Sequence, residues 1–105
     1  MSERQSKEEF KARVLTWAEK LDAPVRMITV RPMRNKWASY STAGNLHFDS
    51  ALLSLDRKLG DYVIVHELLH SSVPNHGKLW KSLMRAHLDD YEVIETQLKR
   101  IGIGG

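Results

Sequence analysis

The first apolar pattern along the chain predicts an amphipathic helix over residues 6–21. Its apolar residues recur at the three- and four-residue spacing of one helix face: Phe10, Val14, Trp17, Ala18 and Leu21. Ser6 and Glu9 have the spacing of a capping box, so they predict where the helix begins. Pro24 disfavours helical backbone in the residue before it, and we therefore expect the helix to end at residues 22–23.

Three short segments after this helix predict strands. Residues 25–31 form a β-branched run with a period of two, and Pro32 restricts that strand to an edge or an end. Residues 37–41 and 46–49 predict two further strands, with Gly44 and Asn45 in the turn between them. Because two short strands alone are marginally stable, we expect all three in one small sheet.

The last half of the chain predicts helices. From about residue 54 to Leu69 the pattern is helical and apolar nearly all round, which is typical of a helix that runs through the core. Residues 71–75 break this helix, another begins near Gly77, and Asp89 or Asp90 caps a last one. The predicted fold class is α+β: an N-terminal helix, a small three-stranded sheet, a core helix and two C-terminal helices. Residues 1–105 would then form a single domain.

Composition restricts the kinds of site this chain can carry. A chain of 105 residues with 42% hydrophobic residues can fill one core. It contains no cysteine, which excludes disulfide scaffolds, thiolate metal sites and a cysteine nucleophile. A metal ion would therefore be held by His, Asp or Glu, and five histidines are available.

Charge and hydropathy favour a soluble, cytoplasmic protein. Residues 2–9 are polar, and no apolar run approaches the roughly 20 residues that cross a bilayer, so we expect no signal peptide and no membrane contact. The net charge of +3 permits nucleic-acid contact. The 16 Lys and Arg residues are spread through the chain, however, and a solvated surface explains them more simply.

One motif carries specific chemistry. His66-Glu67-Leu68-Leu69-His70 is an H-E-x-x-H sequence inside the predicted core helix. Residues four apart share a helix face, so His66 and His70 can direct two imidazoles at one ion, with Glu67 beside them as a general base. Burying such groups in an apolar run is costly unless a metal satisfies them. The competing interpretation is two ordinary hydrogen-bonded histidines at the edge of the core.

A catalytic zinc ion usually takes a third protein ligand and leaves one position open. His76 follows His70 by six residues across the predicted break and is the first candidate. Glu92 or Glu95 on the last predicted helix could take this place instead. His87 fits a packed histidine better.

The stretch from Arg31 to Tyr91 resembles the YgjP-like metallopeptidase domain, which is related to the SprT-like zincins. The resemblance rests on Lys36-Trp37-Ala38-Ser39, on the sequence from Tyr62 to His70, on His76, on Leu79-Trp80 and on Asp90-Tyr91. Ala38 replaces the usual glycine of the signature, and Tyr40 stands where cysteine is common. The resemblance implies a minimal zincin, a zinc-dependent metalloprotease in which His66, His70 and His76 bind one Zn²⁺ ion and Glu67 is the catalytic glutamate.

The expected reaction is hydrolysis of a peptide bond. Zinc on three neutral imidazoles lowers the pKa of a bound water to about 7, and Glu67 would accept its proton. We expect a peptide or protein substrate, added as a strand at the sheet edge formed by residues 44–49. Tyr91 and His87 are the candidates for stabilising the oxyanion. We expect a monomer or a weak oligomer.

Two alternatives to an active protease remain. One is a zinc-binding module that is latent or has no catalytic activity and that acts in protein binding. The other is nucleic-acid association, suggested by the basic residues around the first strands, which are Arg26, Arg31, Arg34 and Lys36.

Overall fold

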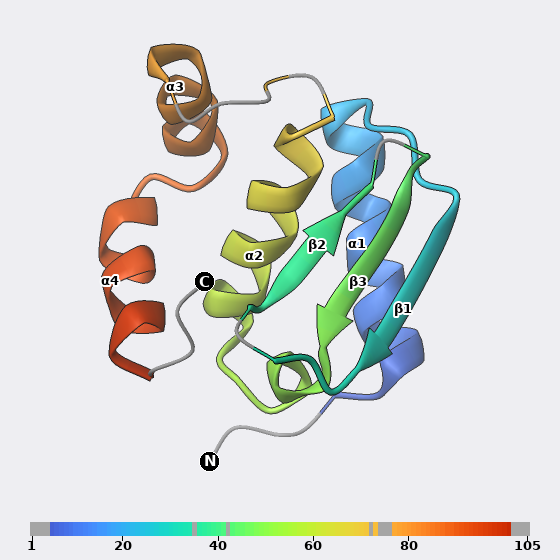
Figure 1. Ribbon diagram of the computed structural model, residues 1–105. Helices are drawn as coiled ribbons and strands as arrows, with labels where there is room; N and C mark the ends of the chain where they lie inside the picture. Colours follow the sequence, from blue (N-terminus) through green and yellow to red (C-terminus); the bar gives the residue numbers. More distant parts are fainter. Residues whose placement is uncertain (1–4, 35, 42, 72, 74–76, 102–105) are drawn as a thin grey trace.

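The computed structural model describes residues 5–34, 36–41, 43–71, 73 and 77–101 of the chain. Its elements follow the predicted order (Figure 1) and confirm the α+β class. The N-terminal half contains α1 (Lys7–Leu21), β1 (Met27–Arg31), β2 (Ala38–Tyr40) and β3 (Asn45–Asp49). The C-terminal half contains a short 3₁₀ helix η1 (Ser50–Leu53), α2 (Arg57–Leu69), α3 (Lys78–His87) and α4 (Tyr91–Ile101).

The predicted capping box begins α1. The Ser6 side chain accepts a hydrogen bond from the Glu9 backbone, and the Glu9 carboxylate accepts one from Ser6 N at 2.8 Å. The helix ends at Asp22, which adopts the left-handed conformation with φ of 53°. Its backbone N–H caps the last turn. The helix therefore ends where Pro24 predicts, and Asp22 forms its C-cap.

Strand order corrects one expectation. The sheet has the order β1-β3-β2, with β1 and β3 parallel and β2 and β3 antiparallel. The predicted hairpin turns at Gly44, whose φ of 87° suits glycine. Residues 45–49 are the central strand, because β3 pairs on both sides, and they offer no free edge to a substrate. The expected edge at residues 44–49 is wrong, and the edges belong to β1 and β2.

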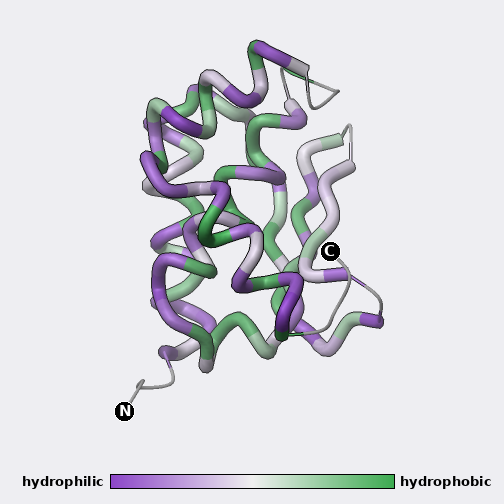
Figure 2. The backbone as a smooth tube through the Cα atoms, turned by 90° about the vertical axis from the view of Figure 1, so that its left-hand side faces the viewer, coloured by the Kyte–Doolittle hydropathy of each residue, from purple (hydrophilic) through white to green (hydrophobic). Residues whose placement is uncertain are grey.

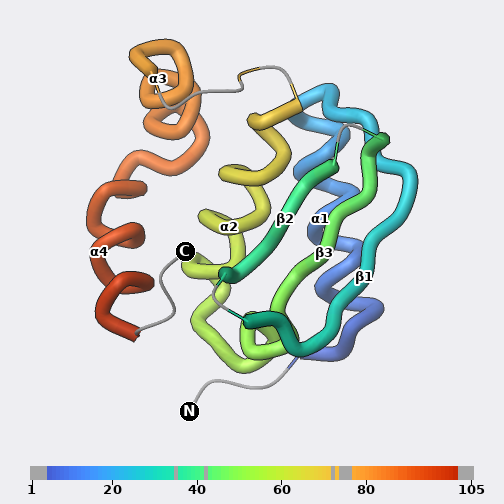
Figure 3. Tube along the Cα trace, in the orientation of Figure 1, coloured from blue at the N-terminus to red at the C-terminus, as the bar shows by residue number. Residues whose placement is uncertain are grey.

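Helix α2 lies at the centre of the molecule, between the sheet and α4 (Figures 1 and 3). It contacts α1, α3, α4, η1 and β2. It begins at Arg57 rather than near residue 54, because Asp56 caps its first turn at Lys58 N and residues 50–53 form η1. Contacts on several sides explain why its sequence is apolar nearly all round.

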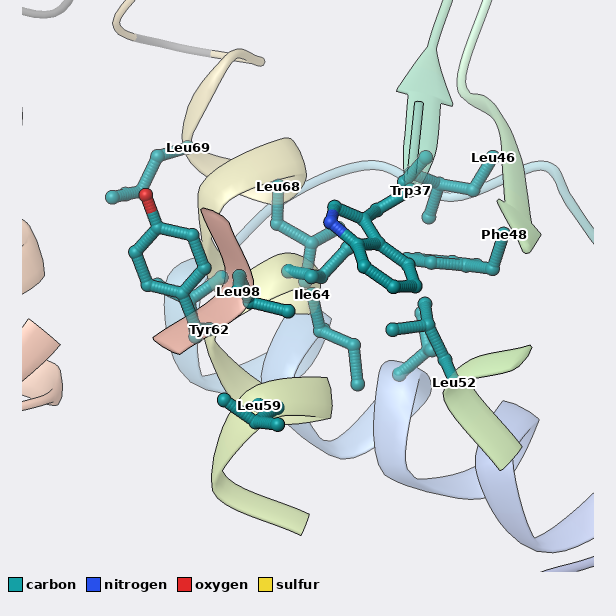
Figure 4. Close-up of a cluster of buried hydrophobic side chains, with 14 of the residues drawn as sticks. Trp37, Leu46, Phe48, Leu52, Leu59, Tyr62, Ile64, Leu68, Leu69 and Leu98 are labelled. Carbon is teal, nitrogen blue, oxygen red and sulfur yellow. The ribbon is translucent and has the colours of Figure 1, made fainter. Parts of the chain in front are cut away.

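The core forms where α2 meets the sheet and α1. Figure 4 shows Trp37 among buried side chains of α2 and β3, including Ile64 and Phe48. Polar and apolar residues alternate along the outer helices (Figure 2), as expected for helices that cover one side of a core. Asp61 of α2 also accepts hydrogen bonds from Arg13 and from Trp17 Nε1, which attach α1 to α2. This packing fixes the helix that carries the H-E-x-x-H motif.

The last two helices form near the predicted boundaries. Gly77 precedes α3, and the backbone carbonyl of Asp90 accepts a hydrogen bond from Ile94 N in the first turn of α4. The Asp90 carboxylate lies 3.8 Å from Lys58 Nζ of α2. Within the described part of the chain, every helix is too short or too polar to cross a membrane.

Candidate metal centre

Three side chains of the last turns of α2 converge on one point. His66, Glu67 and His70 each offer one ligand atom, and these atoms all lie within 4.8 Å of one another. The helix itself creates this arrangement, because positions 66 and 70 lie one turn apart on the same face. The centroids of the two imidazole rings are 4.9 Å apart. The motif thus occupies the C-terminal end of α2, with His70 as its C-cap in helical backbone conformation.

Aromatic rings surround the first imidazole. The Tyr62 ring lies one turn earlier on α2, with its centroid 5.7 Å from that of His66. The Trp80 ring of α3 contacts His66 edge to face at 5.4 Å and contacts Tyr91 of α4 in turn at 5.9 Å. The contacts from α2 and α3, with Tyr91 of α4 packed behind Trp80, restrict the orientation of the His66 side chain.

Glu67 lies in a mostly apolar environment. Only 12% of its side-chain surface is exposed, and burial raises the pKa of its carboxyl group to about 7. The positive charge of Lys36 opposes this shift. His66 Nδ1 lies 3.7 Å from Glu67 Oε2. A carboxyl group with a pKa near 7 can accept and release a proton at neutral pH.

A cavity of about 270 Å³ opens beside His66 and Glu67. Lys36, Trp37 and Ala38, in the segment that enters β2, form one wall of the cavity. Residues of α4 form another wall. The cavity therefore reaches His66 and Glu67 between β2 and α4. A cleft with a few polar groups beside perturbed carboxylates is typical of an active site.

Tyr62 connects the two helices that border this cavity. Its hydroxyl donates a 2.7 Å hydrogen bond to Glu95 Oε2 of α4, and burial and the Glu95 charge raise the pKa of Tyr62. Tyr62 belongs to the family signature but had no predicted role of its own. Its position four residues before His66 was the available signal, because this spacing places both on one helix face.

The third ligand stays a prediction. His76 lies outside the described residues. Glu95 lines the cavity together with His66 and Glu67, whereas Glu92 is exposed and pairs with Arg85 at 3.2 Å. In the described ranges, the group of candidate ligands close enough to share an ion consists of His66, Glu67 and His70.

The other sequence candidates lie elsewhere. His87 packs edge to face against Trp17 at 6.0 Å, as expected for a packed histidine, and Tyr91 is 3% exposed. Neither lines the cavity, so the structure brings no support to their proposed role at the oxyanion. The basic residues of the nucleic-acid hypothesis are all exposed: Arg26, Arg31, Arg34 and Lys36. Of these four, Lys36 lines the cavity.

The residues present fit a metal ion such as zinc. His66 and His70 offer two imidazole nitrogens within a few ångströms of each other, as catalytic zinc sites use, and the Glu67 carboxylate lies beside them, where a base for a metal-bound water would act. Burial raises the pKa of Glu67, and the positive charge of Lys36 compensates its negative charge only in part. A cation at this point would complete that compensation.

Comparison with known proteins agrees with this geometry. Residues 1–101 match the sequence profile of the family described as YgjP-like, metallopeptidase domain. The uncharacterized protein MJ0123 of Methanocaldococcus jannaschii is 32% identical over 78 residues, which are 70% of this chain and 71% of that protein.

Two solved structures have a similar fold. One is the metallopeptidase zymogen of jannalysin from Methanocaldococcus jannaschii, with a TM-score of 0.73 and 29% identity over 88% of this chain and 93% of that one. The other is the metallopeptidase zymogen of abylysin from Pyrococcus abyssi, with a TM-score of 0.74 and 19% identity over 89% and 94%. The predicted zincin-like fold is confirmed.

Proposed function

We propose that this chain, which belongs to the YgjP-like metallopeptidase family, hydrolyses peptide bonds with a zinc ion on His66, His70 and His76 and with Glu67 as the general base. The observation that carries the proposal is the convergence of His66, Glu67 and His70 beside the cavity. His76 completes the ligand set by its spacing from His70, and Glu95 is the alternative because it borders the same cavity.

Glu67 performs the proton transfers in this proposal. A bound zinc ion would supply the Lewis acid that polarises the scissile carbonyl and the attacking water. The Glu67 carboxylate accepts a proton from that water as it attacks, and later donates the proton to the leaving amine. Its largely buried position limits competing contact with bulk water. His66, restrained by the rings of Tyr62 and Trp80, keeps one imidazole in place through the reaction.

The substrate would bind as an extended strand along β2. This strand pairs with β3 on one side, and its other edge faces the side on which α2 and the cavity lie (Figure 1). A peptide strand added there gains main-chain hydrogen bonds, while alternate side chains turn toward the cavity. We also propose that residues 1–105 act as one domain, because α2 contacts helices and strands from both halves of the chain.

The rival proposal is a latent or non-catalytic module. Both solved relatives are described as zymogens, so a purified chain of this kind that holds zinc and cleaves nothing would support latency. Turnover and metal content must therefore be measured on the same sample.

The test combines these two measurements. The chain is loaded with zinc, freed of excess metal, and its zinc content is determined by elemental analysis. The same sample digests a mixed peptide library, and mass spectrometry identifies the cleaved bonds, with a chelator-treated sample as control. We expect one zinc ion per chain and cleavage that the chelator abolishes. Zinc without cleavage would favour the latent module, and no binding at saturating zinc would overturn both proposals.

A further inference from the structure

The cavity beside Glu67 has an apolar interior and charged groups among its lining residues. Trp37, Ala38 and Leu98, which are at most 7% exposed, line it together with Val63 of α2. The charged groups other than Glu67 are Lys36, Lys99 and Glu95, contributed by the segment before β2 and by α4. A cavity of about 270 Å³ has room for one substrate side chain with an apolar stem.

The Glu95 carboxylate already has two interaction partners within the protein. Its Oε2 accepts the 2.7 Å hydrogen bond from the Tyr62 hydroxyl, and its Oε1 lies 3.9 Å from Lys99 Nζ, one turn further along α4. A hydrogen bond and a nearby cation both offset a carboxylate charge locally. Glu95 and Lys99 together therefore give the cavity little net charge.

Lys36 has no comparable partner. Across the part of the chain that the structure describes, no carboxylate oxygen lies within the 4.0 Å limit of an ion pair with its ammonium group. Its side chain is exposed, and its positive charge acts on Glu67. The ammonium group is thus available to a ligand that enters the cavity.

Neighbouring residues in the core and in the sheet fix the position of the Lys36 backbone. The next residue, Trp37, is 5% exposed in the core, and its carbonyl oxygen accepts a 2.8 Å hydrogen bond from Asp49 N at the end of β3. Ala38, which also lines the cavity, begins β2 and pairs with Phe48. The flexible side chain of Lys36 therefore starts from a fixed point at the cavity.

We propose that Lys36 is a specificity-determining residue, which selects substrates that place an acidic side chain, Glu or Asp, in the cavity beside Glu67. The apolar interior would hold the methylene groups of the substrate side chain, and its carboxylate would pair with the Lys36 ammonium. This inference rests on the proposed peptidase function and extends it to the class of substrate. A bound divalent cation would add a second positive charge near the same cavity, which favours an acidic side chain further.

The test compares matched peptides. From the best cleaved peptide of the mixed library, versions are made with Glu, Gln or Lys at each position flanking the scissile bond. We expect kcat/KM to be about two- to fivefold higher for Glu than for Gln at one position, the range of an exposed ion pair, and lower again for Lys. High salt should reduce the preference, because it screens exposed charges.

Variants then assign the preference to one residue. Lys36→Ala should remove it, Lys36→Glu should reverse it toward the Lys peptide, and Lys36→Arg should retain it. Lys7→Glu changes the net charge by the same amount as Lys36→Glu, but at an exposed position in the first turn of α1. It should leave the preference unchanged. Cleavage with equal rates for the Glu, Gln and Lys peptides would overturn the inference while leaving the peptidase function intact.

A binding measurement tests the inference without turnover. The dissociation constants of the Glu and Gln peptides are measured by calorimetry on the zinc-loaded Glu67→Gln variant, with and without Lys36→Ala. We expect tighter binding of the Glu peptide, and equal binding once Lys36 is replaced. Equal affinities before that replacement, or no binding of either peptide, would overturn the role of Lys36 independently of any cleavage rate.

Discussion

Tyr62 of α2 donates a 2.7 Å hydrogen bond to Glu95 of α4, and the Tyr62 ring lies one helical turn before His66 with the ring centroids 5.7 Å apart. The Tyr62 side chain thus contacts a candidate metal ligand and also forms a hydrogen bond to the neighbouring helix, α4. The residue also borders the cavity, and its hydrogen bond joins α2 to α4 there. Tyr62 is 6% exposed, which places the hydrogen bond close to the protein interior.

Replacing Tyr62 by Phe should destabilise the protein modestly. The variant keeps the ring against His66 and removes the hydroxyl, so the expected loss is about 1 kcal/mol, the usual net contribution of such a hydrogen bond. Urea unfolding followed by circular dichroism measures this loss. Glu95→Gln keeps an acceptor for the hydroxyl and should lose less. An unfolding midpoint identical to that of the unmodified chain would contradict a stabilising role for the Tyr62 hydroxyl.

Replacing Glu67 by Gln should separate metal binding from catalysis. The amide is similar in shape to the carboxylate but cannot accept the proton, so hydrolysis should fall by about 10²- to 10⁴-fold while zinc content stays the same. Peptide cleavage and elemental analysis on one sample test this. Glu92→Gln, an exposed residue paired with Arg85, makes the same chemical change away from the cavity and should retain activity. Full activity in the Glu67 variant would rule out its role as the base.

Replacing His76 by Ala tests the third ligand. Loss of a direct ligand should weaken zinc binding by more than the roughly 10- to 100-fold that loss of an outer-shell partner typically costs. Competition with a chromophoric chelator measures the affinity. His87→Ala is the matched control, because His87 packs against Trp17 away from the cavity. If zinc affinity is unchanged in the His76 variant and lost in Glu95→Gln, Glu95 takes the place of the third ligand.

Local sequence patterns predicted the parts of the site that depend on one helix. His66 and His70 lie one turn apart in any regular helix, so their convergence with Glu67 follows from the motif and the apolar periodicity around it. The capping box of Ser6 and Glu9 is local in the same sense, and it formed as predicted.

Contacts between distant segments were not predictable in this way. Tyr62 and Glu95 are 33 residues apart, and no local pattern pairs them. The order β1-β3-β2 depends on how the chain between β1 and β2 crosses the sheet, so the spacing of the strands did not indicate that β3 is central. Lys36 was identified as one of several basic residues, and only the fold brings it to the cavity.

The metal-free protein should lose stability as the pH rises through the range in which Glu67 ionises. Burial raises the pKa of Glu67 in the folded chain to about 7, above its ordinary value of 4.5, so the folded state holds this proton more tightly than the unfolded state. The contribution of Glu67 to the free energy of unfolding is therefore most favourable below pH 4.5 and decreases up to about pH 7. The total decrease is of the order of 3 kcal/mol, from about 1.4 kcal/mol per pKa unit.

Other groups near Glu67 titrate or carry charge, namely His66, Tyr62 and Lys36, so the measurement must isolate one carboxyl group. The free energy of unfolding is measured in a chelator between pH 4 and pH 8 for the unmodified chain and for Glu67→Gln. We expect the variant to become more stable relative to the unmodified chain as the pH rises, because its amide never ionises. A difference that stays constant over this range would show that burial does not raise the pKa of Glu67. Saturating zinc should reduce the pH dependence, since a cation beside the carboxylate favours its ionised form.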